Sequence, residues 1–360
     1  MIKVLMISRA TLNSSVGGDT IQVNETANFL RNIGVEVDIK LSNEEINYSA
    51  YNLLHFFNII RPADILKHIE KCNLPFVVST IFVDYEEFEK NNRKGLVKWI
   101  NKLISSDSTE YLKALARLVL NGEKVGSLRY LAWGHKKSIK YIMSKASMLL
   151  PNSESEYNRL NIKYSGSARY KVIPNAINAS KFTTRSAVDH DRRTVICVGR
   201  IEARKNQYNL ILALNILGYP AYIIGNASPN SKKYYQQCKQ IANSNITFIS
   251  HLSQDDLAEH YLKAKVHALP SWFETTGLSS LEAASMGCNI VVSPNGDTKD
   301  YFKKYASYCN PDSVDSIKVA LETEYNKTSN PEFREYIIRN YTWDITAEKT
   351  LEAYQQVLNI

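Results

Sequence analysis

The stretch from Val266 to Val292 constrains the fold more than any other part of the chain. An apolar run that ends at Pro270 is followed by a polar loop, by apolar residues at helical spacing, and by a second apolar run that begins at Ile290. Proline cannot donate to a sheet ladder, and Gly287 supplies a stop after the helical pattern. The pattern therefore predicts strand, loop, helix and strand, the repeating unit of a parallel α/β sheet.

Two glutamates occupy the part of this unit where α/β proteins bind ligands. Glu274 lies in the loop and Glu282 in the helix, with seven residues between them. Ligands of parallel sheets bind beyond the carboxyl ends of the strands, where helix N-termini offer free N–H groups to anions. The N–H groups of Thr276, Gly277 and Leu278 are therefore candidates for binding an anionic group.

Length and composition indicate two domains in a reducing compartment. With 360 residues, 44% of them hydrophobic, the chain can build two α/β cores of ordinary size. The five cysteines are scattered and form no CxxC pair, which favours the cytoplasm. The first residues fit a strand better than a signal peptide, and no apolar run has the length of a membrane span.

Two basic residues follow the first strand predicted for the second half of the chain. A polar, aperiodic segment at 183–193 predicts a linker, and the apolar run 194–198 predicts the new strand. Arg200 and Lys205 come next. Arginine offers a planar fork of donors and lysine a compact charge, a combination that suits a diphosphate, although solvent-facing ion pairs are the ordinary use of such residues.

These segments resemble the family 4 retaining glycosyltransferases of the GT-B fold. The resemblance rests on the frame Ser-x-x-Glu-x-x-Gly-Leu-x-x-Leu-Glu-Ala at 271–283 and on the Gly-Arg and Lys of 199–205. It implies an α/β chain with two Rossmann-like domains whose parallel sheets face each other across a central cleft. An acceptor-binding domain is expected over residues 1–180 and a nucleotide-sugar-binding domain over residues 190–342. A C-terminal helix at about 343–358 is expected to pack back onto the first domain.

The same resemblance assigns roles to individual residues. Glu274 would contact hydroxyls of the donor sugar, while Arg200 and Lys205 would stabilise the diphosphate leaving group, and these three form the expected catalytic set. The residues expected to bind the donor are Gly17, Gly18, Gly225, Thr276, Gly277, Leu278 and Glu282, the last through the ribose. For Gly17 and Gly18 a plain tight turn is the alternative.

No metal or other cofactor is expected beside the nucleotide-sugar donor. The chain has no Asp-x-Asp cluster at a strand end, and Asp255 with Asp256 fits a helix start after Ser253. The expected donor is a UDP-sugar ahead of a GDP-sugar.

The expected function is a retaining, metal-independent transfer of a hexose to a glycan or to a polyprenyl-diphosphate-linked acceptor. The expected setting is the synthesis of a bacterial surface polysaccharide such as O-antigen, capsule or exopolysaccharide. Front-face transfer is favoured over a nucleophilic role of Glu274. Another GT-B enzyme, such as a nucleotide-sugar epimerase, is the alternative, and a basic nucleic-acid-binding module is a third.

One region carries the positive charge of the chain. Residues 91–145 contain twelve Lys or Arg and three Asp or Glu, while the whole chain has a formal charge of +8. Their mixture with aliphatic and aromatic residues predicts either a helical subdomain with solvated lysines or docking on an anionic membrane surface. No nucleic-acid motif is present, so nucleic acid is not an expected partner. The expected location is the cytoplasm, with peripheral contact to the inner face of the cell membrane.

The first domain departs from the family pattern in one loop. Relatives commonly have a histidine just after the strand that ends near Thr80, whereas this chain has none there. Asp84 or Tyr85 could line the acceptor side instead. His55, at the end of another predicted strand, fits either a packed core or the lining of a cleft.

Overall fold

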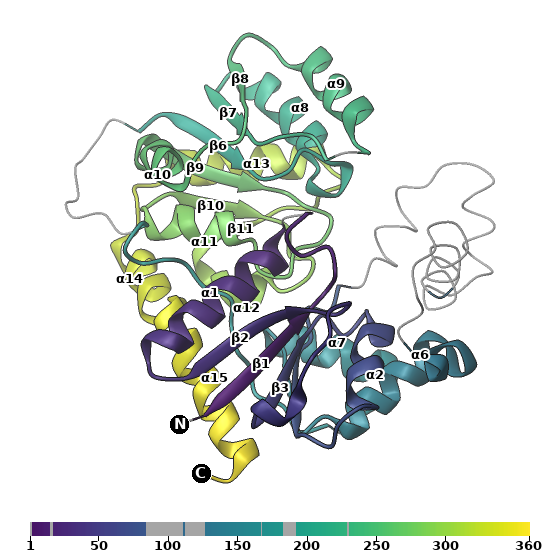
Figure 1. Ribbon diagram of the computed structural model, residues 1–360. Coiled ribbons are helices and arrows are strands. Elements are labelled where there is room, and N and C mark those ends of the chain that lie inside the picture. The colour runs from purple at the N-terminus through teal and green to yellow at the C-terminus, as the bar shows by residue number, and fades with distance from the viewer. Residues whose placement is uncertain are drawn as a thin grey trace. The chain divides into compact units, whose positions relative to one another are not determined.

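The protein divides into two compact units in the computed structural model, which describes residues 2–14, 17–83, 111, 127–166, 168–182, 192–228 and 230–360 (Figure 1). The first unit comprises residues 1–174 together with 343–360, and the second comprises residues 175–342. Each contains one wholly parallel sheet with helices packed on it. The expected class, two Rossmann-like α/β units, is confirmed.

The sheet of the first unit has the strand order β2-β1-β3-β4-β5. Its strands are β1 (Lys3–Ser8), β2 (Glu36–Leu41), β3 (Leu53–Phe57), β4 (Phe76–Ser79) and β5 (Met148–Leu150). Its helices are α1 (Gly18–Asn32), α2 (Pro62–Ile69), α6 (Leu128–Lys145), α7 (Glu154–Tyr164) and α15 (Trp343–Leu358), with a short 3-10 turn at Tyr48–Ala50. The strands β3, β4 and β5 are buried along their whole length, as expected for parallel strands covered on both faces.

The C-terminal helix α15 belongs to this first unit and lies alongside α1 (Figure 1). Tyr354 on α15 is fully buried and its hydroxyl group lies 2.7 Å from Nδ1 of His55 on β3. Lys171 forms an ion pair with Glu352 at 2.5 Å. The last helix thus completes the core that the first strands begin.

The sheet of the second unit has the order β11-β10-β9-β6-β7-β8. Its strands are β6 (Thr194–Val198), β7 (Ala221–Ile224), β8 (Ile246–Ile249), β9 (Ala264–Leu269), β10 (Asn289–Val292) and β11 (Ser307–Tyr308). Its helices are α8 (Gln207–Leu217), α9 (Lys232–Ile241), α10 (Gln254–Lys263), α11 (Leu278–Ser285), α12 (Thr298–Phe302), α13 (Val314–Asn326) and α14 (Pro331–Asn340), with 3-10 turns at Ala203–Lys205 and Lys303–Tyr305. The predicted strand, loop, helix and strand are β9, α11 and β10.

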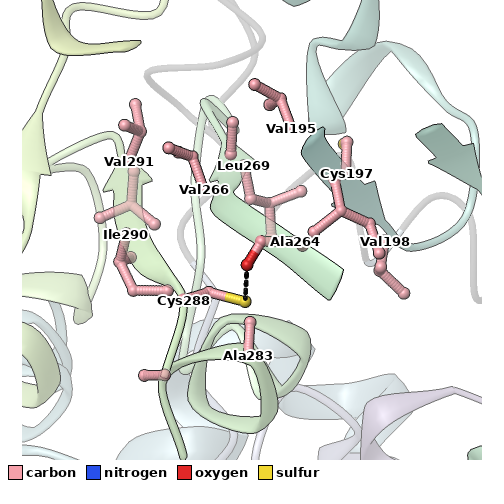
Figure 2. Packing of buried hydrophobic residues seen from close by; sticks show 14 of the residues in the cluster. Val195, Cys197, Val198, Ala264, Val266, Leu269, Ala283, Cys288, Ile290 and Val291 are labelled. Carbon is pink, nitrogen blue, oxygen red and sulfur yellow. Dashed lines mark hydrogen bonds between the residues drawn. The ribbon is translucent and has the colours of Figure 1, made fainter. Parts of the chain in front are cut away.

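The core of the second unit fills the space between its central strands and α11. Figure 2 shows Val195, Val266 and Ile290 from β6, β9 and β10 among these buried residues. Cys288 donates a weak hydrogen bond from Sγ to the carbonyl oxygen of Ala264 at 3.5 Å. This packing fixes the ends of β6 and β9, and the loops that follow them carry the candidate site.

The border between the units differs from the sequence prediction of 180, with a linker at 183–193. The structure divides the chain after Pro174, because the next residues join the second unit. The N–H of Ile177 donates to the carbonyl oxygen of Tyr341 at 2.9 Å, and the buried Phe182 accepts a hydrogen bond from Ser285 at 2.7 Å. Of the expected linker, residues 183–191 lie outside the described part of the chain.

The described residues contain no helix that could span a membrane and no cluster of metal-binding side chains. None of the helices in that part of the chain combines the length and the apolar character that a membrane span requires. Within the same residues, no group of three or more His, Cys, Asp or Glu side chains is arranged to hold a metal ion. Ser253 accepts a hydrogen bond from the N–H of Asp256, so the predicted helix start at Asp255 and Asp256 is confirmed.

Candidate functional site

The loop between β9 and α11 is held against the loop after β10 through its backbone. The N–H of Glu274 donates to Asn295 at 3.2 Å, and the N–H of Asp297 donates to the carbonyl oxygen of Glu274 at 2.8 Å. Gly296 lies between them with φ +92°, and a Cβ built on it would lie 2.0 Å from the carbonyl oxygen of Glu274. Only glycine permits this approach, which sets the position of the Glu274 backbone.

The side chain of Glu274 forms an ion pair with Lys205. Oε1 of Glu274 lies 2.5 Å from Nζ of Lys205, and both side chains are largely removed from water. Burial alone would raise the pKa of Glu274, but the charges of Lys205 and Arg204 outweigh it, so that this pKa lies below its ordinary value. Burial lowers the pKa of Lys205, and the charge of Glu274 opposes that shift. The structure thus brings together two residues that the sequence placed in different segments.

Arg204 is a third member of this cluster that the sequence analysis did not single out. Its guanidinium donates to the carbonyl oxygen of Phe273 at 3.0 Å and to Glu202 at 2.9 Å, and it lies 3.7 Å from Oε1 of Glu274. Its own carbonyl oxygen accepts a hydrogen bond from the N–H of Trp272 at 2.9 Å. Its place directly before Lys205 was the available signal. Arg204 fastens the loop after β6 to the loop after β9.

Arg200 differs from its neighbours in exposure. Its side chain is 51% exposed, and its nearest ion-pair partner, Glu202, is 4.0 Å away. Glu202 is held by Arg204 and by the hydroxyl of Ser228 at 2.7 Å. Arg200 is therefore the cation of this loop with the greatest freedom to meet an anion.

Glu282 lies on α11, away from the Lys205–Glu274 pair in its contacts. Its Oε2 accepts a hydrogen bond from the hydroxyl of Tyr261 at 3.2 Å. Burial raises the pKa of Glu282 to about 7, although the hydrogen bond from Tyr261 lowers it. The two glutamates of the motif therefore have opposite electrostatic settings: Glu274 is held ionised, whereas Glu282 titrates near neutral pH.

Backbone N–H groups at the start of α11 follow Glu274 closely in the sequence. Gly277 takes the left-handed conformation with φ 71°, and α11 begins at Leu278. The first N–H groups of an α-helix have no partner within the helix. The hydroxyl of Ser279 donates to the carbonyl oxygen of Val198 at 3.0 Å, which ties this turn to the end of β6. The candidate residues Thr276, Gly277 and Leu278 are thus placed at a helix N-terminus, as predicted.

The other predicted glycines have different surroundings. Gly225 follows β7 with φ 140°, and a Cβ there would lie 2.1 Å from the carbonyl oxygen of Gly199. Close packing of the two loops therefore explains Gly225 without a ligand. In the first unit, Gly17 is the N-cap of α1, and nothing lies within 4 Å of the position that a Cβ of Gly18 would take. Gly18 thus has open space beside it.

His55 is a packed core residue rather than part of a cleft. Its Nδ1 lies 2.7 Å from the hydroxyl of Tyr354, and its Nε2 lies 2.8 Å from that of Ser79. Burial lowers the pKa of His55 to about 3, so it is neutral. Asp84, Tyr85 and most of the basic region at 91–145 lie outside the described residues, and of that region residues 111 and 127–145 are described.

The side chains and N–H groups described above supply partners for an anion and for a polyol. Arg200, Lys205 and the helix N-terminus supply positive charge and donors for a phosphate group. Glu274 and Glu282 supply carboxylate oxygens, which accept hydrogen bonds from sugar hydroxyls.

The second unit resembles known proteins in sequence, and the whole chain resembles known proteins in fold. Residues 179–342 match the family model described as "Glycosyl transferases group 1". An uncharacterized glycosyltransferase of Methanocaldococcus jannaschii is 28% identical over 213 residues, which are 52% of this chain and 54% of that protein. The chain spans about half the length of the first curated relatives that it matches.

Two solved structures resemble the chain over nearly its whole length. Sucrose-phosphate synthase from Thermosynechococcus elongatus has a TM-score of 0.78 at 16% identity and covers all of both chains. Anabaena HepE, solved in complex with UDP and glucose, has a TM-score of 0.67 at 14% identity and covers 99% of this chain and 100% of that one. At such identities the likeness shows the fold. Residues 179–342 therefore match the group 1 glycosyl transferases in sequence, and the chain has the fold of two Rossmann-like units that these solved structures share.

Proposed function

We propose that the protein is a retaining, metal-independent glycosyltransferase that moves a sugar from a nucleotide-sugar donor to a glycan or lipid-linked acceptor. The second unit binds the donor, and the first unit binds the acceptor. The observation that carries the proposal is the Lys205–Glu274 pair at the N-terminus of α11. The match of this unit to the group 1 glycosyl transferases supports it.

The charges of the cluster suit the transition state of this reaction. As the bond from the anomeric carbon to the diphosphate breaks, positive charge develops on the sugar and negative charge on the leaving oxygens. In the proposed mechanism Arg200, Lys205 and the first N–H groups of α11 stabilise the leaving diphosphate. Glu274 accepts hydrogen bonds from the sugar hydroxyls, and the departing phosphate takes the proton of the acceptor. Transfer on the front face then retains the anomeric configuration.

Glu274 is better suited to holding hydroxyls than to attacking the sugar. Its Oε1 is already engaged by Lys205 and approached by Arg204, which reduces its nucleophilicity. Lys205 can lie between the carboxylate and a phosphate and contact both.

A UDP-sugar is the donor that we expect to stabilise the protein most. A ligand at a hundred times its Kd stabilises the folded state by about 2.7 kcal/mol, which raises Tm by several degrees. We expect this rise with UDP or a UDP-sugar in a thermal-shift comparison of UDP, GDP, ADP and dTDP sugars. Absence of stabilisation by every nucleotide sugar would remove the proposal.

A labelled donor separates transfer from the alternative activity. Transfer predicts that label appears in an acceptor and that the product keeps the anomeric configuration of the donor, which NMR of the product measures. Release of an epimerised sugar without any acceptor would instead favour a nucleotide-sugar epimerase.

We further propose that the acceptor is presented at an anionic membrane surface on the cytoplasmic side, as in the synthesis of a bacterial surface polysaccharide. The support is α6, which carries five Lys or Arg and neither Asp nor Glu. The Arg129 guanidinium and the Lys137 ammonium lie 5.5 and 5.2 Å from the ring of Trp133. Leu128 beside them is 82% exposed. Basic side chains beside a partly exposed aromatic ring and an exposed leucine are typical of contact with phospholipid headgroups.

Charge reversal on α6 tests this contact. The variant with Lys136→Glu, Lys137→Glu and Lys140→Glu should bind vesicles that contain phosphatidylglycerol more than about tenfold more weakly, because each basic residue contributes about 1 kcal/mol near such a surface. Cosedimentation measures the binding. A matched reversal of Lys232, Lys233 and Lys239 on α9 should have little effect. Equal losses in the two variants would contradict the assignment to α6.

A further inference from the structure

Asn175, Thr276 and Tyr301 form a buried, hydrogen-bonded cluster at the loop that leads into α11. The side-chain amide of Asn175 donates to the hydroxyl of Thr276 at 3.1 Å, and that hydroxyl donates to the hydroxyl of Tyr301 at 3.3 Å. The hydroxyl of Tyr301 also accepts a hydrogen bond from the N–H of Asn175 at 3.1 Å. All three residues are at most 5% exposed. The Thr276 hydroxyl is thus used inside the protein, and its residue can serve a ligand only through its backbone.

The same cluster contacts the two segments at which the chain enters and leaves the second unit, which we call the crossing segments. Asn175 is the first residue of this unit and Thr342 the last. Ile177 and Thr342 form an isolated parallel bridge, and the ring of Tyr341 lies 4.9 Å from that of Tyr301. The hydroxyl of Tyr341 donates to the carbonyl oxygen of Asp300 at 3.3 Å. A short chain of contacts therefore runs from the two crossing segments to Thr276.

The backbone of the same loop is also held at Glu274, which forms an isolated parallel bridge with Gly296. This bridge ends at Glu274, whereas α11 begins only at Leu278. Between them, the side chain of Thr276 bonds this turn to Asn175 and Tyr301, while the carbonyl oxygen of Gly277 accepts the first hydrogen bonds of α11. The direction of the N–H groups of Thr276 and Gly277 therefore depends on where Asn175 and Tyr301 hold that hydroxyl.

We infer that Asn175 and Tyr301 are positioning residues for the donor: through Thr276 they orient the N–H groups that receive the diphosphate, and they link this loop to the two crossing segments. The inference rests on the proposed function. A buried hydrogen bond of this kind contributes about 0.5–1.5 kcal/mol, which corresponds to about two- to twelvefold in an equilibrium. Loss of one member should therefore loosen the loop by a measurable factor without unfolding the unit.

Hydrogen exchange in the ligand-free protein tests the positioning role directly. Tyr301→Phe and Thr276→Val each remove one hydroxyl and keep the shape of the side chain. Each should speed amide exchange at residues 280 and 281, whose N–H groups donate to Gly277 of the loop, by about fivefold, the size expected for one lost hydrogen bond. The double variant should show no more than the larger single effect, because both changes break one network. Thr276→Ser keeps the hydroxyl and should restore slow exchange.

A matched control separates positioning from general stability. Tyr234→Phe removes a hydroxyl that accepts from the N–H of Tyr208 at 2.9 Å in the same unit, outside this cluster. It should lower Tm as Tyr301→Phe does, while the loop exchange and the donor KM stay at wild-type values. Tyr301→Phe should raise the donor KM about fivefold and leave the acceptor KM unchanged.

Two results would overturn the inference. One is wild-type exchange at residues 280 and 281 in both Tyr301→Phe and Thr276→Val, and the other is an equal rise in donor KM for Tyr234→Phe and Tyr301→Phe. The exchange measurement needs no substrate, so it decides the positioning role even if no nucleotide sugar binds. A wild-type protein that binds no nucleotide sugar would refute the proposed function instead.

Discussion

Lys205→Met should lower kcat by a factor of about 10²–10³ and also lower the free energy of unfolding by about 3–5 kcal/mol. The first figure is the usual cost of removing one donor that stabilises developing charge. The second is the cost of leaving a buried charge without its partner. Glu274 is 5% exposed, and after the change its nearest described cation would be Arg204 at 3.7 Å. Chemical denaturation and steady-state kinetics measure the two effects.

The double variant Lys205→Met with Glu274→Gln separates the two effects. It removes both charges, so most of the lost stability should return, whereas kcat should remain at the level of the single variant or below. A matched control is Lys327→Met, because Lys327 pairs at 2.5 Å with Glu324, whose side chain is 2% exposed. That change should cost stability and leave kcat unaffected. Normal turnover in Lys205→Met would remove the proposed role of this lysine.

Donor binding should tighten as pH rises through about 7, because in the role that we propose for it Glu282 binds the ribose hydroxyls as an ionised carboxylate. The pKa of Glu282 in the ligand-free protein is raised to about 7 by burial. At pH 6 about a tenth of the molecules would carry the carboxylate, so the Kd for UDP should be about tenfold weaker than at pH 8. Isothermal titration calorimetry over this range gives the profile.

Replacing Glu282 identifies the group that titrates. Glu282→Gln should weaken UDP binding at pH 8 by about tenfold or more, since hydrogen bonds to a charged group are worth about 1.5–3 kcal/mol, and it should flatten the pH profile. Glu335→Gln on the exposed face of α14 should leave both unchanged. A pH profile that survives in Glu282→Gln would show that another group is responsible.

The same shift affects stability with a defined sign. Because the pKa of Glu282 is raised from 4.5 to about 7, folding favours the neutral form of this carboxyl. Its stabilising contribution is complete below about pH 4.5 and is lost as pH rises through about 7. The ligand-free protein should therefore gain Tm at neutral pH from Glu282→Gln, although donor binding suffers.

The periodic patterns were sufficient to predict the parallel sheets. The stretch around Pro270 and Gly287 folds as β9, α11 and β10, since apolar runs and helical spacing reflect burial that the sheet imposes locally. The same patterns placed Glu274 in the loop and the N–H groups of Thr276 to Leu278 at the start of α11. That Lys205 would reach Glu274 could not be read from spacing alone, because the two residues meet only once β6 and β9 are neighbours.

The features that the sequence analysis missed depend on contacts between distant segments. Polar composition drew the predicted border to 183–193, but residues from Asn175 onward are committed to the second unit by their bonds to Thr276, Tyr301 and Tyr341. Gly225 is required by the close approach of its loop to Gly199, which no motif reveals. Arg204 directly precedes Lys205 in the sequence, but its contact with Phe273 forms only in the folded unit.

The backbone bridge between Glu274 and Gly296 also limits how the length of the loop after β10 can be changed. A one-residue insertion or deletion between β10 and α12 would shift the partners of Glu274 and carry its carboxylate away from Lys205. Chimeras that exchange this loop with a relative of different loop length should therefore lose turnover. Thr275, which is partly exposed and makes no side-chain hydrogen bond to the described residues, is a position of the loop between β9 and α11 that can be varied without disturbing that frame.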